Sequence, residues 1–158
     1  MVPFLVLWSN HPHVKGEDPL LPVARYPDQC AANLWAALTR SGVDTRSFHG
    51  TMSWEKPGPN YAIRAQEVAD WLAKPVAGFG KVQKFKGAEA FDKMKKTNGI
   101  VFFQNYWGPG RQGDHIDLWN GSRLTTLSSW LRIQTGISWD GVWSDYKKAQ
   151  SIWFWPVR

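Results

Sequence analysis

The sequence has little cysteine and carries no long apolar run at its N-terminus. Its single cysteine, Cys30, excludes an internal disulfide. The apolar stretch over residues 2–8 is too short to span a bilayer. It also lacks the preceding basic segment and the following small-residue cleavage site of a secretory signal. We therefore expect a strand there, no membrane insertion, and delivery by a dedicated machine if the substrate lies outside the cytoplasm.

Motifs of several enzyme classes are also missing. The chain has no Gly-x-Ser-x-Gly elbow of the serine hydrolases. The glycines at 108 and 110 lack the Lys-Ser/Thr pair that completes a phosphate loop. His11 and His13 suggest a metal, but one cysteine and no HxxxH-type spacing argue against zinc. We therefore expect neither a metal ion nor an organic cofactor.

What the chain does have is tryptophan and positive charge. Its 158 residues fit one domain, residues 1–158, with 11 tryptophans and a formal net charge of +6. Tryptophans pack cores and also form flat platforms for sugars or peptides. The lysine-rich stretches 81–86 and 93–96 are typical of a solvated face. Composition alone is equally compatible with a non-catalytic, basic module that binds cell-wall glycan or nucleic acid.

The apolar pattern is helical in the first part of the chain and strand-like after Gly99. Helices are expected from a cap at Asp28 to Gly42, over residues 60–73 and over residues 88–96. Strands are expected over residues 100–103, 115–119, 122–126 and 152–155. Helices followed by an antiparallel sheet predict an α+β domain.

Cys30 falls in the first turn of the first of these helices, at about the second helical position. A helix N-terminus carries partial positive charge and unpaired N–H groups, which favour a thiolate. The same N–H groups can hold the oxyanion that forms when a thiolate attacks a carbonyl. Cys30 is therefore a candidate nucleophile, although a buried cysteine with a purely structural role is also common there.

His115 opens a predicted hairpin whose turn is Asn120-Gly121. With a two-residue turn, Asp117 faces Leu124 and His115 faces Thr126, while Trp119 faces Ser122. His115, Asp117 and Trp119 then share one face of the strand. A strand histidine beside a helix-borne cysteine is typical of thiol hydrolases, with a third polar group to orient the ring. Asp117 is one candidate for that group and Thr126 is the other, and a histidine satisfied by its neighbours is the structural alternative.

Four segments resemble the type VI secretion amidase effectors, specifically their fourth family. Residues 26–34 (YPDQCAANL) resemble its nucleophile helix, and residues 113–125 (GDHIDLWNGSRLT) resemble its histidine hairpin. Residues 4–12 and the tail, residues 139–148 and 152–155, are similar as well. The resemblance therefore covers both ends and the middle of the chain, and the hairpin is its most specific part.

This resemblance implies a papain-like, NlpC/P60-type α+β fold with N-terminal helices packed on an antiparallel sheet. It implies cleavage of the bond between the γ-carboxyl of D-glutamate and meso-diaminopimelate in peptidoglycan stem peptides. Such proteins are made in the cytoplasm and injected by the type VI secretion apparatus into the periplasm of target bacteria. A cognate immunity protein that plugs the active site is the implied partner.

Carried over by position, the resemblance makes Cys30 the nucleophile and His115 the base. The third member departs from the family pattern, which often has an aspartate where this chain has Thr126. Either Asp117 orients His115, or the triad is weakened. The family often carries further cysteines after the first helix, where this chain reads TMSW over residues 51–54.

Substrate contacts are expected from three residues near the hairpin and a glycine-rich loop, residues 108–113. They are Trp107, Trp119 and Arg111, the tryptophans as groove walls and the arginine as partner of a stem-peptide carboxylate. Packing under the loop is an equally good interpretation of both tryptophans. A Cys–His acyltransferase on the same fold would share every one of these residues. Thiol alkylation at mildly acidic pH separates an enzyme of this kind from a binding module.

Overall fold

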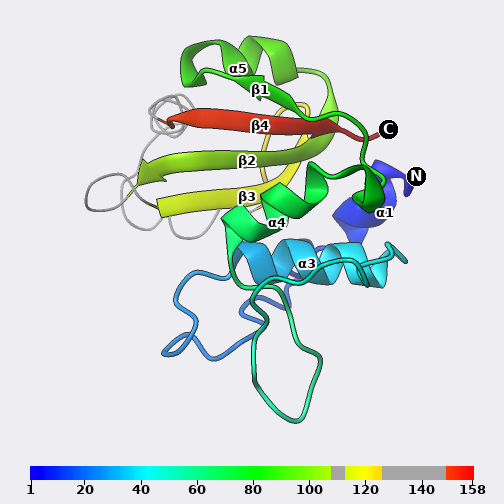
Figure 1. The fold of residues 1–158 in the computed structure, drawn as a ribbon, viewed down its shortest axis with the longest axis vertical. Helices are drawn as coiled ribbons and strands as arrows, with labels where there is room; N and C mark the ends of the chain where they lie inside the picture. The colour runs from blue at the N-terminus through cyan, green and yellow to red at the C-terminus, as the bar shows by residue number, and fades with distance from the viewer. Residues whose placement is uncertain (108–112, 126–148) are drawn as a thin grey trace.

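The computed structural model describes residues 1–107, 113–125 and 149–158, without the side chains of Ala88, Tyr106 and Trp107. Helices cover both faces of one antiparallel sheet, with α3 and α4 on one side and α5 on the other (Figure 1). The helical elements are α1 (Phe4–Ser9), α2 (Pro12–Lys15), α3 (Cys30–Arg40), α4 (Ala65–Leu72), the 3-10 turn η1 (Pro75–Ala77) and α5 (Gly87–Met94). The strands are β1 (Gln83–Phe85), β2 (Asn98–Trp107), β3 (Gly113–Asn120) and β4 (Ser151–Pro156). A mixed helical and antiparallel architecture is therefore confirmed.

The strands lie in the order β1-β4-β2-β3, each antiparallel to its neighbours. The apolar run at residues 100–103 lies in β2 between β4 and β3, so the prediction of a central strand is confirmed. In the described part of the chain β3 is an edge strand, and one of its sides faces away from β2. His115 lies opposite Phe103, and Asp117 lies opposite Val101.

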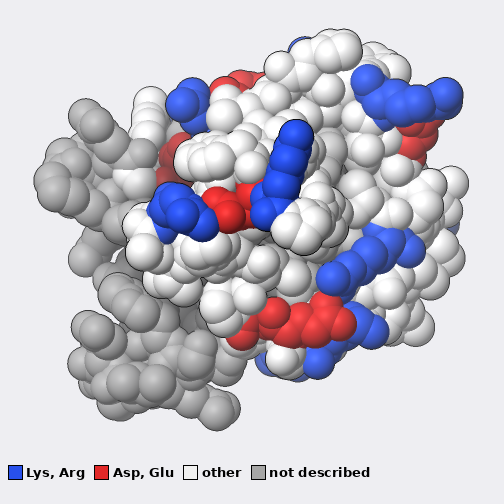
Figure 2. Space-filling view, turned by 90° about the horizontal axis from the view of Figure 1, so that it is seen from below, with Lys and Arg blue, Asp and Glu red and all other residues white. Residues whose placement is uncertain are grey.

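Charges of both signs alternate on the face seen from below in Figure 1. Figure 2 shows lysines and arginines next to aspartates and glutamates on this face, and not gathered into one patch. Elsewhere in the described residues, Arg25 pairs with Glu55 at 2.7 Å, and Arg40 at the end of α3 pairs with Glu17 at 2.6 Å. The net charge of +6 is therefore not concentrated here as a broad surface for a polyanion.

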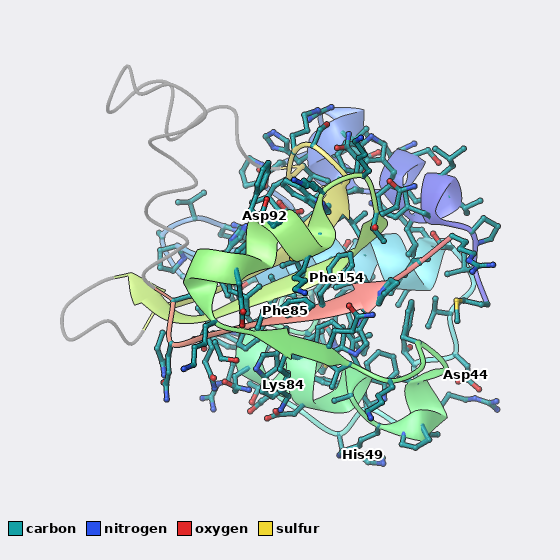
Figure 3. The ribbon with its side chains drawn as sticks, turned by 90° about the horizontal axis from the view of Figure 1, so that it is seen from above. Asp44, His49, Lys84, Phe85, Asp92 and Phe154 are labelled. Carbon is teal, nitrogen blue, oxygen red and sulfur yellow. The ribbon has the colours of Figure 1, made fainter. Side chains whose placement is uncertain are left out.

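Two apolar clusters hold the sheet between the helices. The larger packs α1, α3 and α4 onto the face that carries Ile116 and Leu118 of β3. The smaller lies under α5, where Phe154 of β4 is buried and Phe85 of β1 packs against it (Figure 3). Alternation along β3 sends Trp119 into this second cluster.

The N-terminal apolar run is a helix, so the expected strand over residues 2–8 is wrong. Phe4 and Leu7 are buried at i, i+3 spacing, whereas Leu5 is exposed. That spacing places the two buried side chains on one face of a helical turn, and they pack against α3. A short run in which every residue is apolar has no period, so the sequence could not distinguish the two structures.

The other predicted helices are present with shifted ends. The first begins at Cys30 and ends at Arg40, with Gly42 just beyond it at φ +80. The second is shorter than expected, because Ala62 forms a bridge with Met52 and the helix starts only at Ala65. In the described residues, no helix is long and apolar enough to cross a membrane.

The turn after β3 differs from the predicted two-residue hairpin. Trp119 bridges to Leu124, and the N–H of Asn120 donates to the carbonyl of Arg123 at 3.1 Å. The side-chain oxygen of Asn120 accepts the N–H groups of Ser122 and Arg123, which closes a four-residue loop. A type I′ turn requires a positive φ at both central residues. Gly121 has φ +87, but Asn120 is not among the residues with a positive φ.

This shift overturns the expected pairing. Asp117 is not opposite Leu124, because Leu124 pairs with Trp119. Thr126 lies outside the described residues, so its expected position opposite His115 is not seen. The nearest described threonine, Thr125, instead contacts Asp117.

Candidate active site

Cys30 is the first helical residue of α3, one position earlier than the sequence indicated. Its backbone N–H donates to the carboxylate of Asp28 at 3.2 Å, but the N-cap of α3 is Gln29 and not Asp28, the cap expected from the sequence. This contact occupies the N–H of Cys30 itself. The N–H groups that remain for an oxyanion are therefore those that follow Cys30 in the first turn.

Gln29, the N-cap of α3, holds the preceding irregular segment in place. Its side-chain oxygen accepts the N–H groups of Leu20 and Leu21, both at 3.0 Å. Its side-chain nitrogen donates to the carbonyls of Leu21 and Tyr26, at 2.7 and 3.1 Å. All of these contacts are within the protein, so the amide serves to place the start of α3. No pattern in the sequence indicated this role.

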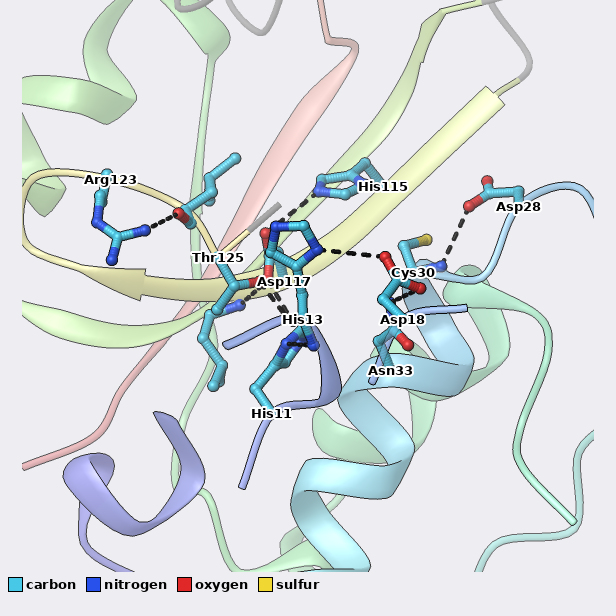
Figure 4. Close-up of polar contacts among 12 residues, drawn as sticks. His11, His13, Asp18, Asp28, Cys30, Asn33, His115, Asp117, Arg123 and Thr125 are labelled. Carbon is cyan, nitrogen blue, oxygen red and sulfur yellow. Dashed lines mark hydrogen bonds and ion pairs between the residues drawn. The ribbon is translucent and has the colours of Figure 1, made fainter. Parts of the chain in front are cut away.

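The sulfur of Cys30 lies at the open side of β3. The backbone N–H of Ile116, the residue after His115, hydrogen-bonds to it. Figure 4 shows Cys30 at the start of α3 and His115 on the neighbouring strand. An edge strand leaves such N–H groups without a strand partner, so a helix terminus can dock there. The fold thus brings Cys30 next to the strand that carries His115.

The surroundings of Cys30 favour its protonated thiol over the thiolate. Burial has the largest effect and raises the pKa of Cys30 well above its usual value, and the carboxylate of Asp28 raises it further. The N–H of Ile116 acts in the opposite direction but does not compensate. Burial therefore opposes the thiolate that a helix N-terminus favours.

His115 and Asp117 lie two residues apart on β3, on the same face of the strand as predicted. Nε2 of His115 is 3.5 Å from Oδ2 of Asp117. The imidazole of His115 also stacks against Phe103, with ring centroids 6.2 Å apart. His115 is 12% exposed and Asp117 0% exposed, so the carboxylate is buried behind a ring that solvent can reach.

Asp117 is ionised although it is fully buried. Burial alone would raise its pKa, but the hydrogen bond from His115 and the nearby rings of His11 and His115 lower the pKa below its usual range. The hydroxyl of Thr125 donates to Oδ1, and the N–H of Leu118 donates to the same atom at 2.7 Å. A buried carboxylate is stable only when its oxygens receive hydrogen bonds in this way.

His11 belongs to the same cluster, although the sequence suggested this residue only as a metal ligand. The ring is 1% exposed, and Nε2 lies 3.6 Å from Oδ1 of Asp117 and 3.3 Å from Oγ1 of Thr125. Burial is the main cause that lowers the pKa of His11, and it outweighs the attraction of Asp117. No local pattern in the sequence links His11 to a strand that begins only at Gly113.

A second polar chain lies beside the first. Nδ1 of His13 is 3.2 Å from Asp18, and the other oxygen of Asp18 accepts a hydrogen bond from Asn33 on α3, also at 3.2 Å. These contacts of Asp18 connect the segment before Cys30 to α3. Among the described residues, no group of three or more histidine, cysteine, aspartate or glutamate side chains is arranged to hold a metal ion.

The residues expected to contact substrate are not brought together. Trp119 is 0% exposed, and its indole N–H donates to the carbonyl of Met94 at 3.1 Å. A ring buried under α5 cannot form a groove wall, so that expectation is wrong for Trp119. Trp107 ends β2 but its side chain is not described, and Arg111 lies outside the described residues.

Solved structures of Tae4 proteins share this fold. The effector Tae4 from Enterobacter cloacae matches with a TM-score of 0.67 and 18% identity, over 100% of this chain and 98% of that one. The Tae4–Tai4 effector–immunity complex from the same organism matches with a TM-score of 0.66 and 18% identity, over 100% of both chains. The Tae4/Tai4 effector–immunity system from Salmonella typhimurium, as a selenomethionine variant, gives 0.63 and 15%, over 98% and 95%. At these identities the likeness shows the fold alone.

Family assignment rests on the sequence. No curated protein matches the chain in a sequence comparison. The model of the family described as "Type VI secretion system (T6SS), amidase effector protein 4" matches residues 26–155, which include Cys30, His115 and Asp117. This chain therefore belongs to the type VI secretion amidase effector 4 family, Tae4.

Proposed function

We propose that this chain is a cysteine peptidoglycan amidase that hydrolyses the γ-D-glutamyl–meso-diaminopimelate bond of stem peptides. The observation that carries the proposal is the position of Cys30, whose sulfur meets the strand residue next to His115, while His115 meets the buried carboxylate of Asp117. The catalytic residues of a thiol hydrolase are a thiol, an imidazole near it, and a polar group such as a carboxylate that orients the imidazole. Membership of an amidase effector family supports the same reaction class.

The reaction begins with proton transfer, because burial of Cys30 favours its protonated thiol. Nε2 of His115 faces Asp117, so Nδ1 is the ring nitrogen that takes the proton as the sulfur attacks the γ-carbonyl carbon. The remaining first-turn N–H groups of α3 stabilise the oxyanion. His115 then protonates the leaving amine of diaminopimelate, and a thioester with Cys30 remains.

Water completes the cycle. His115 removes a proton from water, whose oxygen attacks the thioester carbon, and the sulfur leaves and regains its proton. Asp117 holds the ring in one tautomer and stabilises its protonated form in both halves of the reaction. Thr126 remains the alternative third member and lies outside the described residues. Trp107 and Arg111 remain the proposed substrate contacts.

Delivery and neutralisation follow from the family. The chain would be injected into the periplasm of target bacteria by the type VI secretion apparatus. Its fold would be of the papain-like, NlpC/P60 type. The solved Tae4 structures from Enterobacter cloacae and Salmonella typhimurium include complexes with the immunity protein Tai4. We propose that a cognate immunity protein likewise covers the active site of this chain.

Digestion of purified Gram-negative sacculi tests the proposal. Wild-type protein and Cys30→Ala are incubated with sacculi, and the released muropeptides are identified by mass spectrometry. We expect new fragments ending in γ-D-glutamate with the wild type and none with Cys30→Ala. Circular dichroism checks that the variant is folded. Intact muropeptides with both proteins would overturn the amidase and return the tryptophans and the charge to a binding role.

A further inference from the structure

His11 is a buried histidine that the proposed mechanism does not use. It precedes α2 as its N-cap, far in sequence from β3. Its ring nevertheless reaches Asp117 and Thr125, as Figure 4 shows. A histidine next to a buried carboxylate either fills space in the core or fixes the orientation of that carboxylate. The directions of the hydrogen bonds distinguish these two roles.

The proton of the neutral ring is on Nε2. The backbone N–H of His13 donates to Nδ1 of His11 at 3.3 Å, so Nδ1 must carry a lone pair. A neutral imidazole has its proton on the other nitrogen. Nε2–H therefore points to Oγ1 of Thr125, at 3.3 Å, and to Oδ1 of Asp117, at 3.6 Å.

Thr125 accepts a hydrogen bond from His11 and donates one to Asp117. Its hydroxyl has one proton, which it donates to Oδ1 of Asp117, so its oxygen is left to accept from His11. The donor sequence thus runs from His11 through Thr125 to Asp117. The N–H of Leu118 also donates to Oδ1.

The two oxygens of Asp117 therefore have different partners. Oδ1 accepts hydrogen bonds from Thr125 and Leu118, whereas Oδ2 is the atom that faces Nε2 of His115 at 3.5 Å. We propose that His11 is a positioning residue: it holds Oδ1 through Thr125, so that Oδ2 stays directed at His115. This inference rests on the proposed function, in which Asp117 orients His115.

Two substitutions separate this role from simple core packing. His11→Gln reaches about as far as Nε2 and retains an N–H donor for Thr125. His11→Asn reaches only as far as Nδ1, so it keeps the acceptor for the N–H of His13 and loses the distal donor. Both variants are polar and smaller than or similar in size to histidine. A purely structural role at the start of α2 would be preserved better by asparagine, and the positioning role by glutamine.

The experiment measures kcat and KM for release of γ-D-glutamate fragments across a pH range. We expect His11→Gln to keep kcat within about threefold and His11→Asn to lose about 10- to 100-fold in kcat with KM unchanged. The pH profile of His11→Asn should also move, because His115 then meets a less constrained carboxylate. Equal kcat for His11→Asn and wild type, or better function of His11→Asn than of His11→Gln, would overturn the inference.

A spectroscopic measurement keeps the two proposals distinct. Nitrogen-15 NMR of the imidazoles in Cys30→Ala should show His11 protonated at Nε2, and adding His11→Asn should change the ring signals of His115. Unchanged His115 signals would count against the positioning role even if wild type digests sacculi. Wild type that digests no sacculi overturns the amidase, whereas the NMR result still tests whether His11 controls the contact between Asp117 and His115.

Discussion

Nε2 of His115 lies 3.5 Å from Oδ2 of Asp117, two residues along the same strand. A single edge strand thus carries both the ring and the carboxylate that faces it, and the start of α3 docks beside them. Because side chains alternate along a strand, no second strand is needed to bring this pair together. The departure from the family pattern at Thr126 is therefore compatible with a complete triad.

Asp117→Asn tests that interpretation. Asparagine keeps the shape but loses the charge, and its carbonyl oxygen takes the place of Oδ1, which accepts from Thr125 and Leu118. The amide nitrogen then faces His115, so the ring loses both the acceptor that orients it and the stabilisation of its protonated form. We expect kcat/KM on sacculi to fall by about 10³-fold or more. Thr126→Ala is the matched comparison, and its kcat/KM should change little. A large loss in Thr126→Ala with a small one in Asp117→Asn would make Thr126 the third member.

The pH dependence of stability should report on His11. Its pKa in the folded protein is below that of the unfolded chain, about 6.5, so the unfolded state binds more protons as pH falls. The free energy of unfolding is therefore highest above about pH 6.5 and decreases below it, by at most about 1.4 kcal/mol per pH unit for one proton. Urea unfolding at several pH values should show this slope in the wild type and a smaller slope in His11→Gln.

The exposed histidine His49 provides the control for that slope (Figure 3). His49→Gln should leave the pH dependence of the free energy of unfolding as it is in the wild type. If His11→Gln and His49→Gln give the same curve, then burial of His11 does not contribute to acid sensitivity.

Asp28→Asn should make the thiol of Cys30 easier to ionise. Burial is the main cause of its raised pKa, but the carboxylate of Asp28 adds to it, and asparagine removes that charge while keeping an acceptor for the N–H of Cys30. We expect the rate of alkylation by iodoacetamide to rise at a lower pH in Asp28→Asn than in the wild type. Asp44→Asn, in an exposed loop, should behave as the wild type. If the pH midpoint of the alkylation rate in Asp28→Asn is the same as in the wild type or higher, the charge of Asp28 does not raise the pKa of Cys30.

Trp119→Phe distinguishes a core residue from a groove wall. Phenylalanine removes the indole N–H, so that the carbonyl of Met94 keeps only the N–H of Thr97 as a donor, and the smaller ring leaves a cavity in a fully buried site. We expect a loss of about 1–3 kcal/mol in the free energy of unfolding, measured by urea denaturation, with KM unchanged. Trp107→Ala, at a proposed substrate contact, should instead raise KM. A raised KM with unchanged stability in Trp119→Phe would restore Trp119 to the groove.

Local patterns in the sequence determined much of the fold. The spacing of Ala31, Leu34 and Leu38 and the glycine at 42 placed α3 within one or two residues, since helix periodicity and caps act over a few positions. The apolar runs that form β2 and β4 are recognisable for the same reason. Alternation along β3 is also a local property, and it suffices to put His115 and Asp117 on one face of the strand.

Only the tertiary structure decided what lies around those residues. Whether residues 4–9 form a helix depends on packing against α3, because a uniformly apolar run has no period of its own. Asn120 closed a longer loop through its side chain, and that moved Leu124 opposite Trp119. The burial of Cys30, and the meeting of His11 with Asp117, result from long-range packing that no local pattern encodes. The sequence by itself thus determined the candidate nucleophile and base, and the fold determined their burial and their partners.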